Sequence, residues 1–155
     1  MTGRFNYAKT FPEGFHTLAG VENAVKNCGL ESQLLELMKV RASQLNGCSF
    51  CIDMHTKDAR AEGETEQRLY ALSAWQEAPF FTARERAALA WTEALTNIQQ
   101  GHAADDVYEE ARREFTENEL GKLTLAISLI NAWNRIAIAS RAEAGTYQPR
   151  PHAMA

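Results

Sequence analysis

Apolar residues recur every three or four positions along most of this chain, and this spacing limits what it can fold into. Leu18, Val21 and Val25 show it near the amino terminus, and Leu120 and Leu123 begin the longest such stripe. This is the period of an α-helix that buries one face. The sequence has no run of alternating β-branched residues of the kind that builds a sheet. We therefore predict a compact, all-α, multi-helix fold.

Capping residues and glycines divide the pattern into segments. Thr82-Ala-Arg-Glu85 and Thr116-Glu-Asn-Glu119 are capping boxes, and Asn46-Gly47 is a left-handed helix stop. We expect an irregular lead-in over residues 1–16, helices over about 17–29, 32–45, 48–62, 65–72, 82–99 and 116–145, a short helix capped by Asp105, a connection over 75–81, and a tail over 146–155.

A length of 155 residues fits one domain spanning residues 1–155, large enough to bury a core without disulfide or metal staples. The net charge of -4 argues against a nucleic acid or an anionic membrane as the partner. No run approaches the roughly 18 uninterrupted apolar residues of a membrane span, and residues 1–12 lack the apolar block of a signal peptide. These features predict a cytoplasmic protein.

Two of the three cysteines form the motif Cys48-Ser-Phe-Cys51, and His55 follows one turn later. On an α-helix, positions i, i+3 and i+7 fall within an arc of roughly 60°. Both sulfurs and the imidazole can therefore meet in one small volume. Cys48 lies at the start of its helix, where unpaired backbone N–H groups and the helix dipole favour an anion. A thiolate is expected there, and a thiolate attacks a peroxide or a disulfide.

The imidazole of His55 stands in the (i, i+4) relation to Cys51 that lets it take a thiol proton. The Asn46-Gly47 turn folds the preceding helix back antiparallel, which brings Glu36 into register with this site. Glu36 could then orient and polarise His55, directly or through water. In such a site one thiolate is oxidised to sulfenic acid and the second cysteine condenses with it to a disulfide, which an external thiol reopens.

These residues resemble the alkylhydroperoxidase D-like (AhpD-like) branch of the carboxymuconolactone decarboxylase family. Its pattern of a glutamate, a CxxC and a histidine four residues later is matched by Glu36, Cys48, Cys51 and His55. The likeness extends over most of residues 20–143 and includes the segment Met38 to Cys48, Ala-Leu-Ala-Trp91-Thr-Glu and Asn131-Ala-Trp133-Asn134-Arg135-Ile136.

The resemblance implies a peroxidase-like or disulfide-exchanging enzyme, assembled as a homotrimer or homohexamer, with no cofactor. It implies that Cys51 is the thiol activated through His55 and Glu36, and that Cys48, nearer the helix start and the solvent, is its disulfide partner. One position departs from the family: Phe50 stands where the best-studied members carry a second histidine, which serves proton delivery and a link to lipoyl-type adaptors. Lactone decarboxylation is disfavoured because that branch lacks the cysteine pair.

Other interpretations stay open at this point. Cys48, Cys51 and His55 could hold zinc if Cys28, His16 or Glu36 supplied the fourth ligand, although a helix-borne trio has little need of one. The module could also be a non-catalytic redox sensor. Cys28 alone is most simply a small buried apolar residue. The trio Trp133, Asn134 and Arg135 is interpreted as packing and interface residues.

Overall fold

A computed structural model describes residues 2–149 of the chain, and the last six residues of the predicted tail, 150–155, lie outside them. The described part is all-α and contains no strand. Its elements are α1 (Tyr7–Thr10), α2 (Pro12–Lys26), α3 (Ser32–Asn46), α4 (Ser49–Ala61), α5 (Glu66–Ala71), the 3₁₀ turn η1 (Leu72–Ala74), α6 (Ala83–Thr96), α7 (Asp105–Glu114) and α8 (Glu117–Ser140). The predicted fold class is confirmed.

Local signals fix most helix ends where the sequence placed them. Gly47 ends α3 in the left-handed conformation with φ 69°. Both predicted capping boxes form, at the first turns of α6 and α8. Two ends differ. Asp105 is the first residue of α7 rather than its cap, and α8 ends at Ser140, where Arg141 turns left-handed at φ 56°, short of Gly145.

The irregular lead-in predicted for residues 1–16 is wrong after residue 6. The side chain of Asn6 caps α1, and α2 starts at Pro12 instead of near Thr17. Proline is favoured at a helix start because its N–H would be unpaired there and its φ is already helical. Gly14 lies within α2, and because it has no Cβ the ring of Phe11 can occupy the space that a Cβ would fill.

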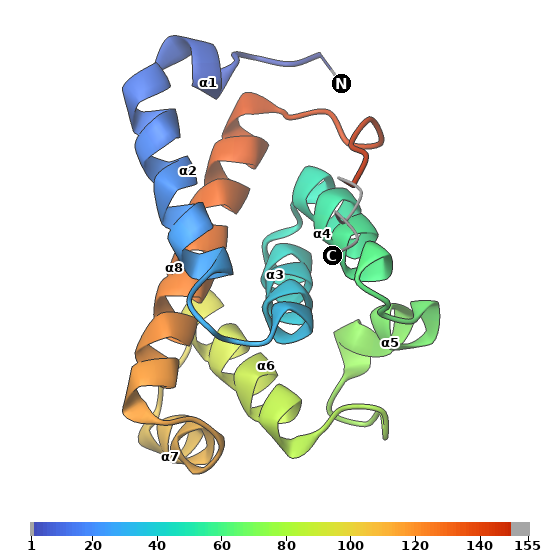
Figure 1. The fold of residues 1–155 in the computed structure, drawn as a ribbon, viewed down its shortest axis with the longest axis vertical. Helices are drawn as coiled ribbons and strands as arrows, with labels where there is room; N and C mark the ends of the chain where they lie inside the picture. Colours follow the sequence, from blue (N-terminus) through green and yellow to red (C-terminus); the bar gives the residue numbers. More distant parts are fainter. Residues whose placement is uncertain (1, 150–155) are drawn as a thin grey trace.

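The helix α3 is the centre of the molecule and packs against α4, α6 and α8 (Figure 1). Figure 1 also shows α2 and α8 side by side along one edge, and α4 beside α3 on the other. The larger buried cluster joins residues of α3, α6 and α8, among them Met38, Trp91 and Ile127. The smaller one lies between α3, α5, η1 and α6 and includes Leu37, Leu72 and Phe81. Both faces of α3 are therefore buried.

One helix of residues 2–149, α8, is long and apolar enough to cross a membrane by length and composition, with mean hydropathy 1.2 in its most apolar window. It reaches that value without an uninterrupted apolar run, and 44% of the window is buried inside the molecule. The core helix of a packed domain meets the same criteria, so α8 is weak evidence for a membrane.

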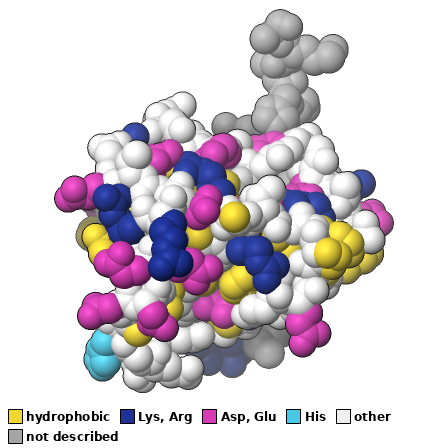
Figure 2. All heavy atoms as spheres, turned by 90° about the horizontal axis from the view of Figure 1, so that it is seen from below, with side chains coloured by type: hydrophobic (Ala, Val, Ile, Leu, Met, Phe, Trp, Pro, Cys, Tyr) yellow, Lys and Arg dark blue, Asp and Glu magenta, His cyan; other side chains and the backbone are white. Residues whose placement is uncertain are grey.

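Figure 2 shows the surface from one side. Positive and negative side chains are interspersed over the described residues of this face.

Candidate active site

The hairpin of α3 and α4 brings Glu36 to His55, as the sequence predicts. The left-handed turn at Gly47 reverses the chain, so the middle of α3 faces the middle of α4. Nδ1 of His55 lies 2.8 Å from Oε2 of Glu36, and both side chains are buried. A carboxylate at this distance holds the proton on Nδ1, which leaves Nε2 as the basic nitrogen of the imidazole.

A residue that the sequence reasoning missed completes this pair. The side chain of Lys39 is only 2% exposed, and its Nζ lies 3.1 Å from Oε1 of Glu36 and 2.8 Å from Oε1 of Glu22. Glu22 belongs to α2, so the contact ties α2 to the site. The (i, i+3) spacing of Glu36 and Lys39 is visible in the sequence, but such pairs usually lie in solvent. Only the packing of α2 over α3 buries it.

These charges set the ionisation of Glu36. Burial raises the pKa of its carboxyl group, but the hydrogen bond and charge of His55 and the ammonium of Lys39 outweigh burial and lower the pKa to about 2. Burial likewise lowers the pKa of Lys39, and the carboxylates of Glu36 and Glu22 raise it above its ordinary value. Glu36 is thus an anion, and Lys39 a cation, across the physiological range.

The two cysteines lie next to each other, with their sulfurs 2.8 Å apart and both thiols reduced. Cys48 is not in the helix: it is the N-cap of α4, with extended backbone angles, whereas Cys51 lies in the first turn. The expectation that Cys48 lies nearer the solvent is wrong, because the residue exposures are 1% for Cys48 and 2% for Cys51. A disulfide requires only a small approach of the two sulfurs.

The negative charge of the pair belongs to Cys48. A hydrogen bond from the Cys51 thiol lowers the pKa of Cys48 most; burial opposes it, and the backbone N–H groups of Cys51 and Phe50 and the side chain of Asn134 lower it further, to about 7. The hydrogen bond to Cys48, burial and the charge of the Cys48 thiolate raise the pKa of Cys51 far above its ordinary value. The predicted stabilisation of a thiolate by the helix amino terminus therefore applies to Cys48.

Direct proton transfer from Cys51 to His55, expected from the (i, i+4) spacing, is not set up. Among the described residues, the hydrogen-bond partner of His55 is Glu36, and neither sulfur bonds to the imidazole. The reason is that the carboxylate draws the ring toward α3. Cys51 and His55 instead share a cavity, so a group bound in it can bridge them.

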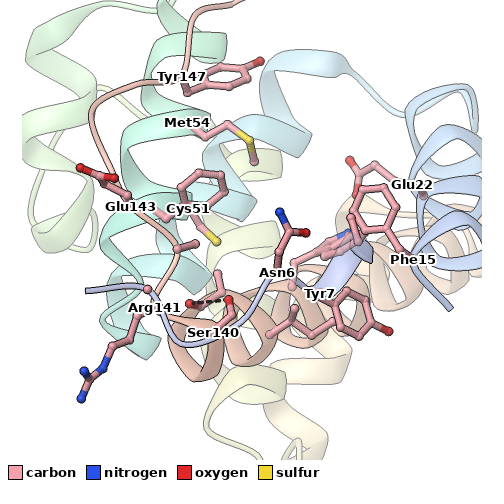
Figure 3. Close-up of a pocket in the computed structure, with 18 of the residues that line it drawn as sticks. Asn6, Tyr7, Phe15, Glu22, Cys51, Met54, Ser140, Arg141, Glu143 and Tyr147 are labelled. Atoms are coloured by element: carbon pink, nitrogen blue, oxygen red, sulfur yellow. Dashed lines mark hydrogen bonds between the residues drawn. The ribbon is translucent and has the colours of Figure 1, made fainter. Parts of the chain in front are cut away.

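This cavity measures about 650 Å³ and lies between α2, α4, the C-terminal end of α8 and both terminal segments. Figure 3 shows the sulfurs of Cys51 and Met54 directed into it, with Tyr7 and Phe15 on the opposite side. Aromatic and aliphatic side chains form most of its wall. Cys48 is absent from the wall, so a ligand meets the sulfur of Cys51 first.

The C-terminal segment is anchored on α4 at the rim of this cavity. The hydroxyl of Tyr147 donates to Oδ1 of Asp58 at 2.7 Å, and Nζ of Lys57 donates to the carbonyl of Tyr147. The backbone N–H of Gly145 donates to Oδ2 of Asp53. The part of the predicted tail up to residue 149 therefore packs on the molecule and forms part of the cavity wall.

The described residues bring three metal-ligating side chains together, Glu36, His55 and Asp58, with one ligand atom of each within 4.8 Å of the others. Neither cysteine belongs to this group. Glu36 is already bonded to His55 and Lys39, and Asp58 to Tyr147. The geometry thus supports hydrogen bonding here. Of the fourth ligands considered for a zinc site, Cys28 packs against the larger core cluster and His16 is exposed.

Comparison with known proteins gives a family match over about half of the chain. The model of the carboxymuconolactone decarboxylase family matches residues 12–94, which include Glu36, both cysteines of the pair and His55. The chain is also 44% identical over 139 residues to the uncharacterized protein YdfG of Bacillus subtilis, covering 90% of this chain and 95% of YdfG.

The fold is shared by solved structures, among them the following two. A protein of unknown function from Agrobacterium tumefaciens, described as a candidate antioxidant defence protein AhpD, superposes with a TM-score of 0.91 at 44% identity, covering 94% of this chain and all of the other. The debrominase Bmp8 superposes with a TM-score of 0.80 at 19% identity, covering 89% of this chain and 74% of the other. The second likeness concerns the fold alone.

Proposed function

Because the chain belongs to the AhpD-like branch of the carboxymuconolactone decarboxylase family, we propose that it is a thiol-dependent peroxidase that reduces hydroperoxides through Cys48 and Cys51. The observation that carries the proposal is the cavity in which the sulfur of Cys51 and the imidazole of His55 face one space, with a second sulfur 2.8 Å behind the first. A bound hydroperoxide would meet a thiol and a base together.

In the first step, the sulfur of Cys51 attacks the terminal oxygen of the hydroperoxide and the O–O bond breaks. The product is a sulfenic acid on Cys51 and an alkoxide, which leaves as the alcohol after taking up the thiol proton. Because the pKa of Cys51 is raised, this proton leaves only as the attack proceeds. The bound hydroperoxide, which bridges Cys51 and His55 in the cavity, relays this proton to Nε2 of His55, whose Nδ1 is bonded to Glu36, and His55 then returns it to the alkoxide.

In the second step, the thiolate of Cys48 attacks the sulfenic sulfur of Cys51. A disulfide forms and hydroxide leaves, taking a proton to become water. The low pKa of Cys48 supports this role, since its thiolate is present at neutral pH before any substrate arrives. A dithiol reductant then restores both thiols by exchange and is itself oxidised to a disulfide.

The test is turnover of cumene hydroperoxide with dithiothreitol as reductant, followed as peroxide consumed. Cys51→Ser should abolish turnover, and Cys28→Ser, which removes the third thiol, should leave it unchanged. Full turnover by Cys51→Ser would refute the proposal. A redox sensor, the alternative function, would consume one equivalent of peroxide and then stop.

The assembly and location proposed for the chain rest on the family likeness and the composition. We propose a homotrimer or homohexamer in the cytoplasm, reduced by a thiol partner still to be identified. Sedimentation analysis of the purified protein tests the assembly, and a monomer would contradict it.

A further inference from the structure

A second sulfur faces the cavity beside that of Cys51. Met54 follows Cys51 by three residues on α4, and side chains three apart on a helix lie on one face with their Cβ atoms about 5–6 Å apart. Both residues line the cavity, and Figure 3 shows both sulfurs directed into it. A hydroperoxide bound for attack by Cys51 therefore lies beside a thioether as well.

The other methionine of the described residues has a different environment. Met38 of α3 is 0% exposed, belongs to the larger core cluster and does not line the cavity. Met54 is half-buried, and its side chain forms part of the cavity wall. Because a ligand in the cavity can reach only one of these two thioethers, Met38 is an internal reference for any reaction at Met54.

A thioether reacts with a hydroperoxide in its neutral form, so Met54 needs neither a thiolate nor a base. A lone pair of the Met54 sulfur attacks the terminal peroxide oxygen, an S–O bond forms and the O–O bond breaks. The proton of the transferred oxygen moves to the departing oxygen, which leaves as the alcohol. The sulfur is oxidised to a sulfoxide and the hydroperoxide is reduced, so the reaction needs no other oxidant or reductant.

The state of the thiol pair decides which sulfur reacts. While Cys51 carries a thiol, it competes with Met54 for the bound hydroperoxide. When Cys48 and Cys51 form a disulfide and the reductant is exhausted, the thiol of Cys51 is gone, and a further hydroperoxide in the cavity meets the thioether of Met54. Oxidation of Met54 is thus tied to an excess of peroxide over reductant.

A sulfoxide at Met54 would change the wall of the cavity, because it replaces an apolar side chain with a polar one. Phe15, Phe50 and Ile136 also line the cavity, and their side chains have no hydrogen-bond donor for the new oxygen. An apolar hydroperoxide that binds there would remove water from this oxygen without replacing its hydrogen bonds. The ligand would therefore bind more weakly.

We propose that Met54 is a site of oxidation whose sulfoxide weakens the binding of apolar hydroperoxides and so slows the enzyme when peroxide exceeds the reductant. The regulatory part of this proposal rests on the proposed function. The oxidation itself needs only a hydroperoxide in the cavity.

The first test locates the oxidation. The Cys48–Cys51 disulfide is formed with diamide, and the full chain is then treated with an excess of cumene hydroperoxide. Peptide mass spectrometry should find sulfoxide at Met54 and roughly tenfold less at Met38, since oxidation follows access to the peroxide. Oxidation of Met54 that does not exceed that of Met38 would overturn the proposal.

The second test measures binding. After the peroxide is removed, dithiothreitol reopens the disulfide and leaves the sulfoxide, and the KM for cumene hydroperoxide should be roughly tenfold above that of the untreated protein. A methionine sulfoxide reductase should restore it. Met54→Leu should keep the KM that it had before treatment, whereas the matched control Met38→Leu, a volume-conserving change in the core, should weaken as the parent does. A treated Met54→Leu that weakens as much as the parent would overturn the regulatory role.

Failure here is distinguishable from failure of the proposed function. Turnover by the untreated parent, without sulfoxide at Met54 after treatment, removes the oxidation site alone. Sulfoxide at Met54 in a protein that never turns over peroxide removes the peroxidase and its regulation and leaves the site of oxidation.

Discussion

Replacement of Lys39 by methionine tests the buried chain of charges that supports the site. Lys39→Met keeps the length and most of the volume of the side chain, but it removes the cation between Glu36 and Glu22. Removing one partner of a buried ion pair usually costs 3–5 kcal/mol, because the other charge stays buried without compensation. Glu36 keeps its bond to His55, and Glu22 is 22% exposed at the side chain and can turn to water. We therefore expect a loss of about 3 kcal/mol in the free energy of unfolding at pH 7.

For a chain of 155 residues this loss corresponds to a melting temperature about 9 °C lower. The assay is urea denaturation followed by circular dichroism, at pH 7 and at several values down to pH 3. The pKa of Glu36 is lowered to about 2 in the folded protein, so its contribution is present above pH 4.5 and is lost as the pH falls toward 2. In the variant, Glu36 takes up its proton at a higher pH, and the stability deficit should shrink over this window.

The matched control is Lys57→Met. Nζ of Lys57 lies 2.9 Å from Oδ2 of Asp53, a distance similar to those of the Lys39 ion pairs, but 31% of the Lys57 side chain is exposed. Exposed (i, i+4) pairs contribute about 0.5 kcal/mol, so this variant should unfold close to the parent. A Lys39→Met protein within 1 kcal/mol of the parent at pH 7, or a deficit that does not change with pH, would refute the reasoning.

The remaining predictions concern the chemistry of the site. After one equivalent of peroxide, Cys48→Ser should accumulate a sulfenic acid on Cys51 that dimedone traps, whereas Cys51→Ser should not; trapping in the reverse variant would exchange the two roles. Alkylation of Cys48, resolved by peptide mass spectrometry, should rise with pH through a midpoint near 7, because the thiolate forms above its pKa. A midpoint near 9 would contradict the stabilisation described. Glu36→Gln should lower kcat/KM for peroxide by roughly 100-fold, since Nδ1 of His55 loses its anionic partner, and unchanged turnover would remove Glu36 from the mechanism.

Much of the fold was predictable because its signals are local. A glycine after Asn46, a cysteine at a helix start and two capping boxes each act within a few residues, and the helices of the structure begin or end at them. The pairing of Glu36 with His55 was also predictable, because a tight turn between two helices sets the register of the residues on either side of it.

The rest depends on contacts between distant parts of the chain. From the sequence alone Lys39 resembles a solvated residue of α3, because its ion pair with Glu22 forms only when α2 packs on α3. Asn134 resembles an interface residue, because its hydrogen bond with Asn46 forms only when the end of α3 packs on α8. The irregular lead-in predicted over residues 1–16 is wrong for a different, local reason: Asn6 caps α1, and proline at a first helical position, here Pro12, favours a helix.

The hairpin of α3 and α4 and the two ends of the chain contribute different parts of the site. The hairpin of α3 and α4 carries Glu36, the cysteines and His55 on rigid helices, while the cavity in front of Cys51 is completed by residues from the two ends of the chain, such as Tyr7 and Tyr147. Short terminal segments with few buried residues tolerate substitution more readily than a central hairpin. Changes in these segments would therefore alter which ligands enter while leaving the ionisation of Cys48 intact, because the groups that lower its pKa belong to α4 and α8.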